Sequence, residues 1–268
     1  LKKKGKSDYA QNLEIHKNQS LPKPATLKIE KPYNILITGI GGSGVITLGA
    51  ILGTAAHLEG KGSSTLDVAG LAQRNGPVTS HLRISNSPSE LHATRIASGT
   101  ADLILGCDIV VTTGIEPLSK INSQTTNIVV NSHVAPTSAF ATNPNLDLSS
   151  ARMIKALKKS TNKNLFNAIN ATGLATALMG NSIAVNFFLV GYAIQKGLFP
   201  LSLEAIERAI ELNGVSIDMN KESLYWGRYA ATDQKFVESV AYDDKTIIAQ
   251  PDSLESIFNE RFTFLEDY

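Results

Sequence analysis

A glycine-rich turn placed directly after an apolar run decides the fold of this chain. The run is Tyr33-Asn34-Ile35-Leu36-Ile37, and the turn is Thr38-Gly39-Ile40-Gly41-Gly42-Ser43-Gly44-Val45. Together they predict a strand, a tight turn and the start of a helix. Three of the glycines have the G-x-G-x-x-G spacing, which allows a sharp turn, close approach of a ligand, and packing of helix on strand. The N–H groups at a helix start also favour an anion such as phosphate.

The elements that follow the turn predict an alternating α/β chain. Val45 to Leu58 carries apolar residues at a 3.6-residue period, which predicts the first helix. Further apolar runs lie within Ala101–Thr112 and at Asn127–Asn131, and both lack charges in their centres, as strands covered on both faces do. A last strand is expected at Leu165–Ala171. We therefore expect a Rossmann-like, mostly parallel sheet with flanking helices and a C-terminal helical layer.

The stretch after the first helix disfavours a nicotinamide cofactor. A dinucleotide-binding unit needs a second strand that ends in an acidic residue about 20 residues past the turn. The segment from Glu59 to Asp67 has no apolar run, so no strand is expected there, and Glu59 falls at a helix end. The ribose contact of such a cofactor is therefore missing from the expected place.

Val78–Ile84 alternates apolar with polar or cationic side chains, which predicts a half-exposed strand. His81 and Arg83 share one face of this strand because side chains repeat with period two. The pair could hold an anionic ligand or a partner carboxylate, or could be simply solvated.

The composition describes a globular chain of a reducing compartment. With 268 residues, 43% of them hydrophobic, the chain can bury a substantial core. Its single cysteine, Cys107, excludes an intrachain disulfide and any iron–sulfur or zinc cluster ligated by cysteines of this chain alone. We expect this thiol to be buried and inert. No apolar run approaches the roughly 20 residues that span a bilayer, so we expect a cytoplasmic protein without a membrane contact.

Charge and periodicity divide the chain into three parts. Residues 1–31 hold eight Lys and three acidic residues, a net charge of +5, and are expected to be a basic, solvated linker. The remainder carries about −4, which argues against nucleic acid as a partner. We assign residues 32–200 to an α/β domain and residues 201–268 to a C-terminal helical extension that packs on it.

The helices expected in the second half are apolar or amphipathic. Ile183–Ile194 is apolar nearly all round and belongs inside the protein or an interface; its Asn186 would need a hydrogen-bond partner, from another helix or from a ligand. Trp226 is either an interface anchor or a packed core residue. A last helix from Leu254 reaches the chain end without a stop signal, and with the missing initiator Met this suggests a piece of a longer polypeptide.

Four motifs resemble, in order and spacing, the gamma domain of the 2-oxoacid:ferredoxin oxidoreductases. They are Gly39-x-Gly41-Gly42-x-Gly44-Val45, Asp67-x-x-Gly70-Leu71-x-Gln73-Arg74-x-Gly76, Ser80-His81-x-Arg83-Ile84 and Ala101-Asp102-Leu103-x-x-Gly106-x-Asp108. The later stretch from Gly214 to Arg228, together with Asn186 and Gly191, is similar to the fused, single-chain indolepyruvate ferredoxin oxidoreductases.

The resemblance implies oxidative decarboxylation of a 2-oxoacid with thiamine diphosphate and Mg, electron transfer through [4Fe-4S] clusters to ferredoxin, and formation of an acyl-CoA. This chain has one cysteine and no G-D-G…N pattern. The thiamine and iron–sulfur domains would therefore be partners within the same enzyme, whose holoenzyme we expect to be a dimer. The chain itself would be inactive in isolation and would help to enclose the substrate and CoA.

The resemblance also gives a set of candidate cofactor-binding residues, without a catalytic or metal-ligating residue in this chain. They are Gly39, Gly41, Gly42, Ser43, Gly44, Gln73, Arg74 and Arg83. The glycine turn is either a corner that faces a phosphate or CoA, or a structural elbow. An alternative of a different class is a stand-alone nucleotide-binding or regulatory module with a Rossmann-like core.

Overall fold

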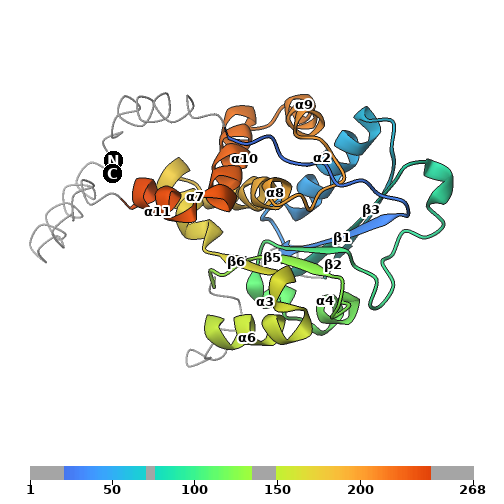
Figure 1. Ribbon diagram of the computed structural model, residues 1–268, viewed down its shortest axis with the longest axis horizontal. Coiled ribbons are helices and arrows are strands. Elements are labelled where there is room, and N and C mark those ends of the chain that lie inside the picture. Colours follow the sequence, from blue (N-terminus) through green and yellow to red (C-terminus); the bar gives the residue numbers. More distant parts are fainter. Residues whose placement is uncertain (1–20, 71–75, 135–148, 243–268) are drawn as a thin grey trace, which may run out of the picture.

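A mixed sheet forms the centre of the protein. The computed structural model describes residues 21–70, 76–134 and 149–242 (Figure 1). Within these residues the strands are β1 (Tyr33–Ile40), β2 (Gly62–Ala69), β3 (Pro77–Ser85), β4 (Leu103–Gly106), β5 (Asn127–Asn131) and β6 (Phe166–Ile169). Their order is β2-β3-β1-β4-β5-β6, with β1, β4, β5 and β6 parallel and β3 antiparallel to both β1 and β2. The predicted α/β fold is confirmed.

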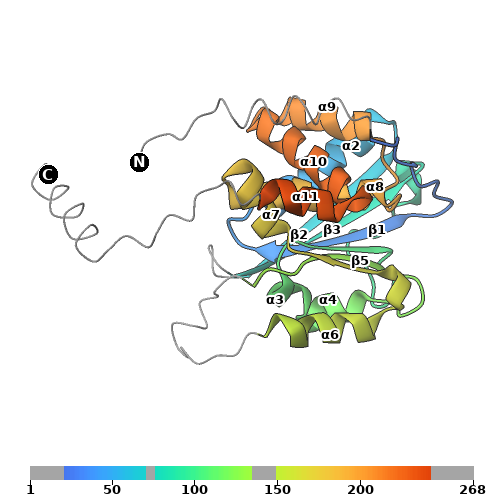
Figure 2. The ribbon, with the colours of Figure 1, turned by 60° about the vertical axis from the view of Figure 1, so that its left-hand side comes forward.

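Helices cover both faces of the sheet, as Figures 1 and 2 show. One face carries α2 (Val45–Leu58), α7 (Ala171–Met179), α8 (Val185–Gln195), α9 (Leu203–Asn213), α10 (Ile217–Thr232) and α11 (Gln234–Ala241). The other face carries α3 (Ile109–Thr112), α4 (Ile115–Lys120) and α6 (Ser150–Ser160), and the 3-10 turns are η1 (Pro88–Glu90), η2 (Lys163–Leu165) and η3 (Ser182–Ala184). The sheet therefore separates a large core under the first layer from a smaller one around Leu36, Ile104 and Ile128.

Local signals in the sequence explain most helix boundaries. α2 begins and ends where the apolar period predicts, and α9 begins after Ser202, whose side chain accepts a hydrogen bond from the Ala205 amide. α9 ends at Gly214, which has the left-handed conformation that glycine adopts without strain. None of the described helices is long and apolar enough to cross a bilayer.

Three expectations were wrong, each for a physical reason. The segment from Gly62 to Ala69 forms β2 although it has no apolar run, because all eight of its residues pair with β3. The strand from Val78 to Ile84 is buried on both faces rather than half-exposed, because helices and the segment around Ile96 cover it. The apolar run after Gly106 turns into α3, because Asp108 caps a helix by accepting from the Val111 amide at 2.8 Å.

α8 and α10 cross at two glycines. A Cβ atom at Gly191 would lie 2.0 Å from the Leu224 carbonyl oxygen, and one at Gly227 would lie 1.9 Å from the Phe188 carbonyl oxygen. Only hydrogen in place of a side chain allows this approach, so the crossing depends on both glycines. Trp226 is 3% exposed beside this crossing, which confirms it as a packed core residue rather than an exposed anchor.

Residues 21–31 lie against the helical layer. The Leu27 amide donates to the Phe199 carbonyl (2.9 Å), Gln195 donates to the Pro22 carbonyl (2.9 Å), and Asn86 donates to the Ile29 carbonyl (2.8 Å). This end of the expected linker therefore contacts the rest of the protein although most of its residues are exposed, and residues 1–20 lie outside the described chain. The helix expected from Leu254 also lies outside it.

Candidate functional site

The glycine turn lies at the carboxyl edge of the parallel strands, where the chain directions diverge. After β1 the chain continues into α2 on one face, and after the neighbouring β4 it continues into α3 on the opposite face (Figure 1). The crevice outside such a switch point is where α/β sheets usually bind ligands. The turn therefore occupies the position in this fold that is best suited to a site.

Each glycine in the turn has a separate local cause. Gly42 and Gly44 have φ angles of 88° and 86°, a conformation that other residues adopt only under strain. A Cβ at Gly39 would lie 2.5 Å from Val45 Cγ2, so this glycine lets α2 sit close to β1. The Gly41 amide donates to the Gly76 carbonyl at 2.8 Å, which joins the turn to the segment before β3.

Asn186, near the start of α8, holds the turn from behind. Its Nδ2 donates to the Ser43 carbonyl oxygen at 2.7 Å, and its side chain is buried, with 4% of the residue exposed. Its Oδ1 has no hydrogen-bond partner among the described residues. The partner that the sequence demanded for Asn186 is therefore the glycine turn itself, and one buried acceptor remains unpaired beside it.

A hollow of about 540 Å³ opens in front of the turn. Its lining residues are Ile40, Gly41, Gly42, Ser43, Ser182, Ile183 and Val185. None of these carries a charge, so the donors that the lining offers to a ligand are backbone amides and hydroxyl groups. Ser43 Oγ is engaged with the Ile40 carbonyl at 2.6 Å, which leaves the Ser182 hydroxyl as the other lining donor.

Asp108, just after β4, and Asn131, at the end of β5, add polar side chains to the carboxyl ends of the parallel strands. The sequence patterns alone did not assign these two residues to the site. Burial raises the pKa of Asp108, against the opposing effect of hydrogen bonds from the Val111 and Val110 amides. Asn131 donates to the Cys107 carbonyl (3.1 Å) and to Thr172 Oγ1 (2.7 Å). A usable signal was present, because Asp108 is the first polar residue after the apolar run of β4, and Asn131 is the polar residue that ends the apolar run of β5.

Cys107 lies inside the protein, apart from any group of side chains that could hold a metal ion among the described residues. Cys107 is buried, as expected, and burial followed by the nearby Asp108 charge raises the pKa of its thiol to about 12, so an inert thiol remains the prediction. No cluster of three or more His, Cys, Asp or Glu side chains suited to a metal occurs in residues 21–70, 76–134 and 149–242. Glu59 contacts Lys61 at 2.7 Å and accepts from the Ser202 amide at 2.7 Å, so it is engaged away from the turn.

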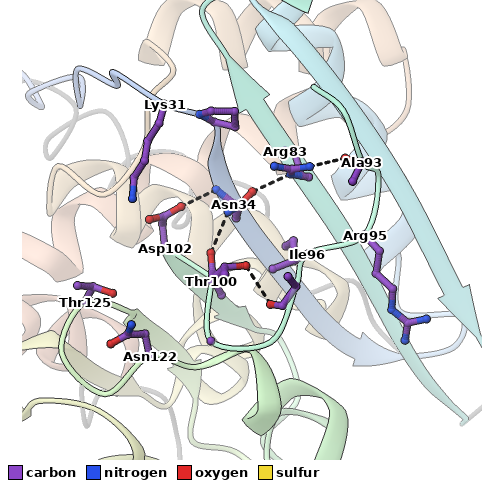
Figure 3. A pocket seen from close by; sticks show the side chains of 14 residues that line it. Lys31, Asn34, Arg83, Ala93, Arg95, Ile96, Thr100, Asp102, Asn122 and Thr125 are labelled. Carbon is purple, nitrogen blue, oxygen red and sulfur yellow. Dashed lines mark hydrogen bonds between the residues drawn. The ribbon is translucent and has the colours of Figure 1, made fainter. Parts of the chain in front are cut away.

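The structure does not bring Arg83 together with the turn. Arg83 pairs with Asn34 at the start of β1, so it lies at the amino ends of the parallel strands, opposite the turn. There it lines a cavity of about 530 Å³ (Figure 3). Its Nε donates to Asn34 Oδ1 at 2.8 Å and its Nη1 donates to the Ala93 carbonyl. These contacts tie the segment around Ala93 to the sheet. Gln73 and Arg74 lie outside the described residues.

His81 also lies away from the turn, inside the sheet. It is fully buried, its Nδ1 accepts from the Ile96 amide at 3.2 Å, and its Nε2 lies 3.6 Å from Glu116 Oε1. Burial is the largest effect on its pKa and lowers it, although Glu116 acts in the opposite direction. The partner carboxylate expected for this strand is therefore Glu116, which also contacts Arg95 at 2.6 Å.

The fold and the glycine turn at the switch point agree with comparisons to known proteins. Residues 34–228 match the family described as pyruvate ferredoxin/flavodoxin oxidoreductase, and the chain belongs to this family. It is 32% identical over 209 residues to "Indolepyruvate oxidoreductase subunit IorB" of Pyrococcus horikoshii, which covers 75% of this chain and 96% of that protein. The same subunit of Thermococcus kodakarensis is also 32% identical, again with 96% of its length covered.

Solved structures support the fold. The pyruvate oxidoreductase subunit PORC of Thermotoga maritima is similar with a TM-score of 0.51 at 22% identity, over 74% of this chain and 96% of that one. The 2-oxoglutarate:ferredoxin oxidoreductase of Magnetococcus marinus, solved with 2-oxoglutarate, coenzyme A and succinyl-CoA bound, gives 0.56 at 16% identity and covers 76% of this chain but 32% of that chain. The IorB relatives are separate subunits, whereas the sequence resemblance pointed to a fused enzyme.

Proposed function

We propose that this chain is the gamma-type subunit of an indolepyruvate-type 2-oxoacid:ferredoxin oxidoreductase that converts an aryl-pyruvate to an acyl-CoA. The observation that carries the proposal is the identity of 32% over 96% of an indolepyruvate oxidoreductase subunit, combined with the glycine turn at the switch point of the sheet. Thiamine diphosphate, held by a partner domain, supplies the decarboxylation chemistry when bound. Iron–sulfur clusters, held by partner domains, would supply the route for electrons to ferredoxin. The cytoplasmic location remains part of this proposal.

We infer that the turn forms one wall of the CoA site. The shape fits a phosphate of CoA, because Gly42 and Gly44 leave the backbone bare and the start of α2 presents N–H groups. The lining residues lack a cation, so we assign the balancing charge to Arg74, which belongs to the second of the four family motifs.

The enzyme reconstituted with its thiamine and cluster subunits provides the test. Arg74→Ala should raise the KM for CoA about tenfold and leave the KM for the 2-oxoacid unchanged, as expected for the loss of roughly 1.4 kcal/mol of phosphate binding. Arg95→Ala is the matched control, because Arg95 lies at the opposite edge of the sheet. An unchanged KM for CoA would remove Arg74 from the site. Tight binding of NAD or NADP to the chain alone would favour the stand-alone nucleotide-binding module instead.

A further inference from the structure

β2 forms an edge of the sheet, and its outer side meets no strand among the described residues. It pairs with β3 without a bulge, from Gly62 opposite Ser85 to Ala69 opposite Val78. In an antiparallel pair, alternate residues direct their N–H and C=O groups away from the partner strand. β2 therefore presents an ordered row of unpaired backbone groups.

The side chains of β2 lack the usual protection of an edge. Native edges are commonly blocked by Pro, by several charged side chains, by a bulge or by a very short strand. β2 has eight residues, Gly-Ser-Ser-Thr-Leu-Asp-Val-Ala, with Asp67 as its one charge. The opposite edge, β6, has four residues. Of the two edges, β2 is the one that offers a template long enough for a specific strand pairing.

We propose that β2 pairs antiparallel with β2 of a second copy of this chain, so that the two sheets join around a two-fold axis. Such an axis stands perpendicular to the sheet and keeps the same face of both copies on the same side. Two residues that lie opposite each other across the contact must therefore point to the same face of the joined sheet. This holds when the axis passes beside one residue of β2, so that this residue lies opposite its own copy.

Charge and apolar contact select the central residue. An axis beside Asp67 would set two carboxylates directly opposite each other, which is destabilising. An axis beside Leu66 sets Leu66 against Leu66 of the second copy, Thr65 against Asp67, and Ser64 against Val68. An axis beside Thr65 would place Leu66 against Ser64 and lose the apolar pair. Leu66 and Val68 are half-buried in one copy, and the register centred on Leu66 would cover both.

The self-complementarity of β2 is the reason to choose a second copy as the occupant. A strand of another protein would place no symmetry requirement on β2. The register centred on Leu66 contains an apolar pair, a hydroxyl facing a carboxylate, and no pair of like charges. These are the features of an isologous contact, in which one surface is complementary to itself.

Cysteine cross-linking of the purified full chain tests this register. Opposite residues in an antiparallel pair have Cα atoms about 4.5–5.5 Å apart, which a disulfide can bridge. Leu66→Cys should therefore form a covalent dimer under mild oxidation at least tenfold faster than Ser64→Cys. In the proposed register the two copies of residue 64 are offset by four residues, about 13 Å along the strand, which is too far for a disulfide. Cys107 is buried and does not contribute.

A charge pair of variants tests the same contact without cysteine. Leu66→Lys sets two ammonium groups opposite each other and should convert the dimer to a monomer in sedimentation velocity, whereas Thr65→Lys faces Asp67 of the second copy and should keep the dimer. A wild-type chain that stays monomeric, or equal cross-linking of both cysteine variants, overturns the proposal. The proposal would also be overturned if, in the complex, a different subunit covered residue 66 and prevented the Leu66→Cys thiol from cross-linking. None of these outcomes depends on CoA binding, so the inference and the proposed function can fail separately.

Discussion

Replacing Gly227 by Ala should disrupt the crossing of α8 and α10 and strongly destabilise the protein. The new Cβ would lie 1.9 Å from the Phe188 carbonyl oxygen, whereas such atoms normally stay more than about 3 Å apart. The obstacle is backbone, so a side-chain rotation cannot relieve it, and the two helices must separate by about 1 Å at a fully buried contact. Overpacking of this kind costs about 1–3 kcal/mol.

The net effect can be worked from two opposing contributions. Ala gains about 0.5–1 kcal/mol over Gly within a helix, but separation of the helices also loosens the packing of Phe188, Leu224 and Trp226. Taking the upper end of the overpacking cost and subtracting the gain of Ala leaves a net loss of about 2 kcal/mol for Gly227→Ala. With a urea dependence of about 3 kcal/mol per molar, the unfolding midpoint falls by about 0.7 M.

The assay has a built-in local probe. Trp226 is the single Trp of the chain and lies next to Gly227, so its fluorescence reports the crossing while far-UV circular dichroism reports the whole fold. Gly53→Ala in α2 is the matched control, since its Cβ would meet only Ser63 Oγ at 3.7 Å, and it should be neutral or raise stability by up to about 1 kcal/mol. A Gly227→Ala midpoint within experimental error of wild type would refute the steric reasoning.

Three further expectations concern single side chains. Burial lowers the pKa of His81 below its ordinary value of 6.5, so the unfolded chain binds the proton more tightly than the folded chain does. The free energy of unfolding should therefore fall as the pH drops below about 6.5. Urea midpoints between pH 7.5 and 5.5 should show this loss in wild type and a flatter profile in His81→Gln. Asn186→Asp removes the donor to the Ser43 carbonyl and sets a carboxylate against it, and should cost about 2 kcal/mol in unfolding free energy, while an unchanged melting curve would show that the contact does not hold the turn. The Cys107 thiol should resist a thiol reagent at pH 8 in the folded chain and react fully in denaturant, and rapid labelling of the native protein would contradict its burial.

The sequence predicted the elements whose formation depends on local pattern. α2 follows from a clear helical period, and β1 and β5 follow from uncharged apolar runs. β2 could not be predicted in the same way. Its Ser, Thr and Asp residues have no apolar run, and the strand exists because β3 supplies a complete pairing partner. That partner is a tertiary contact, which overrides the weak preference of the segment itself.

The candidate site was predictable at the turn and not beyond it. Gly44, the last glycine of the G-x-G-x-x-G spacing, has a positive φ angle, and so does Gly42, which lies outside that spacing. Asn186 reaches the turn from 143 positions away along the chain, so no local pattern could connect the two. Arg83 is the opposite case: its motif suggested that it lies near the turn. Its strand pairs so that Arg83 lies opposite Asn34, at the far ends of the strands from the turn. Whether the turn binds CoA remains a prediction.

α8 links the glycine turn to its buried crossing with α10. Asn186 touches the turn, and Gly191, five residues further on and thus about 7.5 Å along the axis, rests directly on the backbone of α10. The depth at which Asn186 meets the turn is therefore set from the far side of the helical layer. Changes on α10 that leave the turn untouched, whether natural or introduced, can raise or lower that amide by fractions of an ångström and so adjust the site from behind.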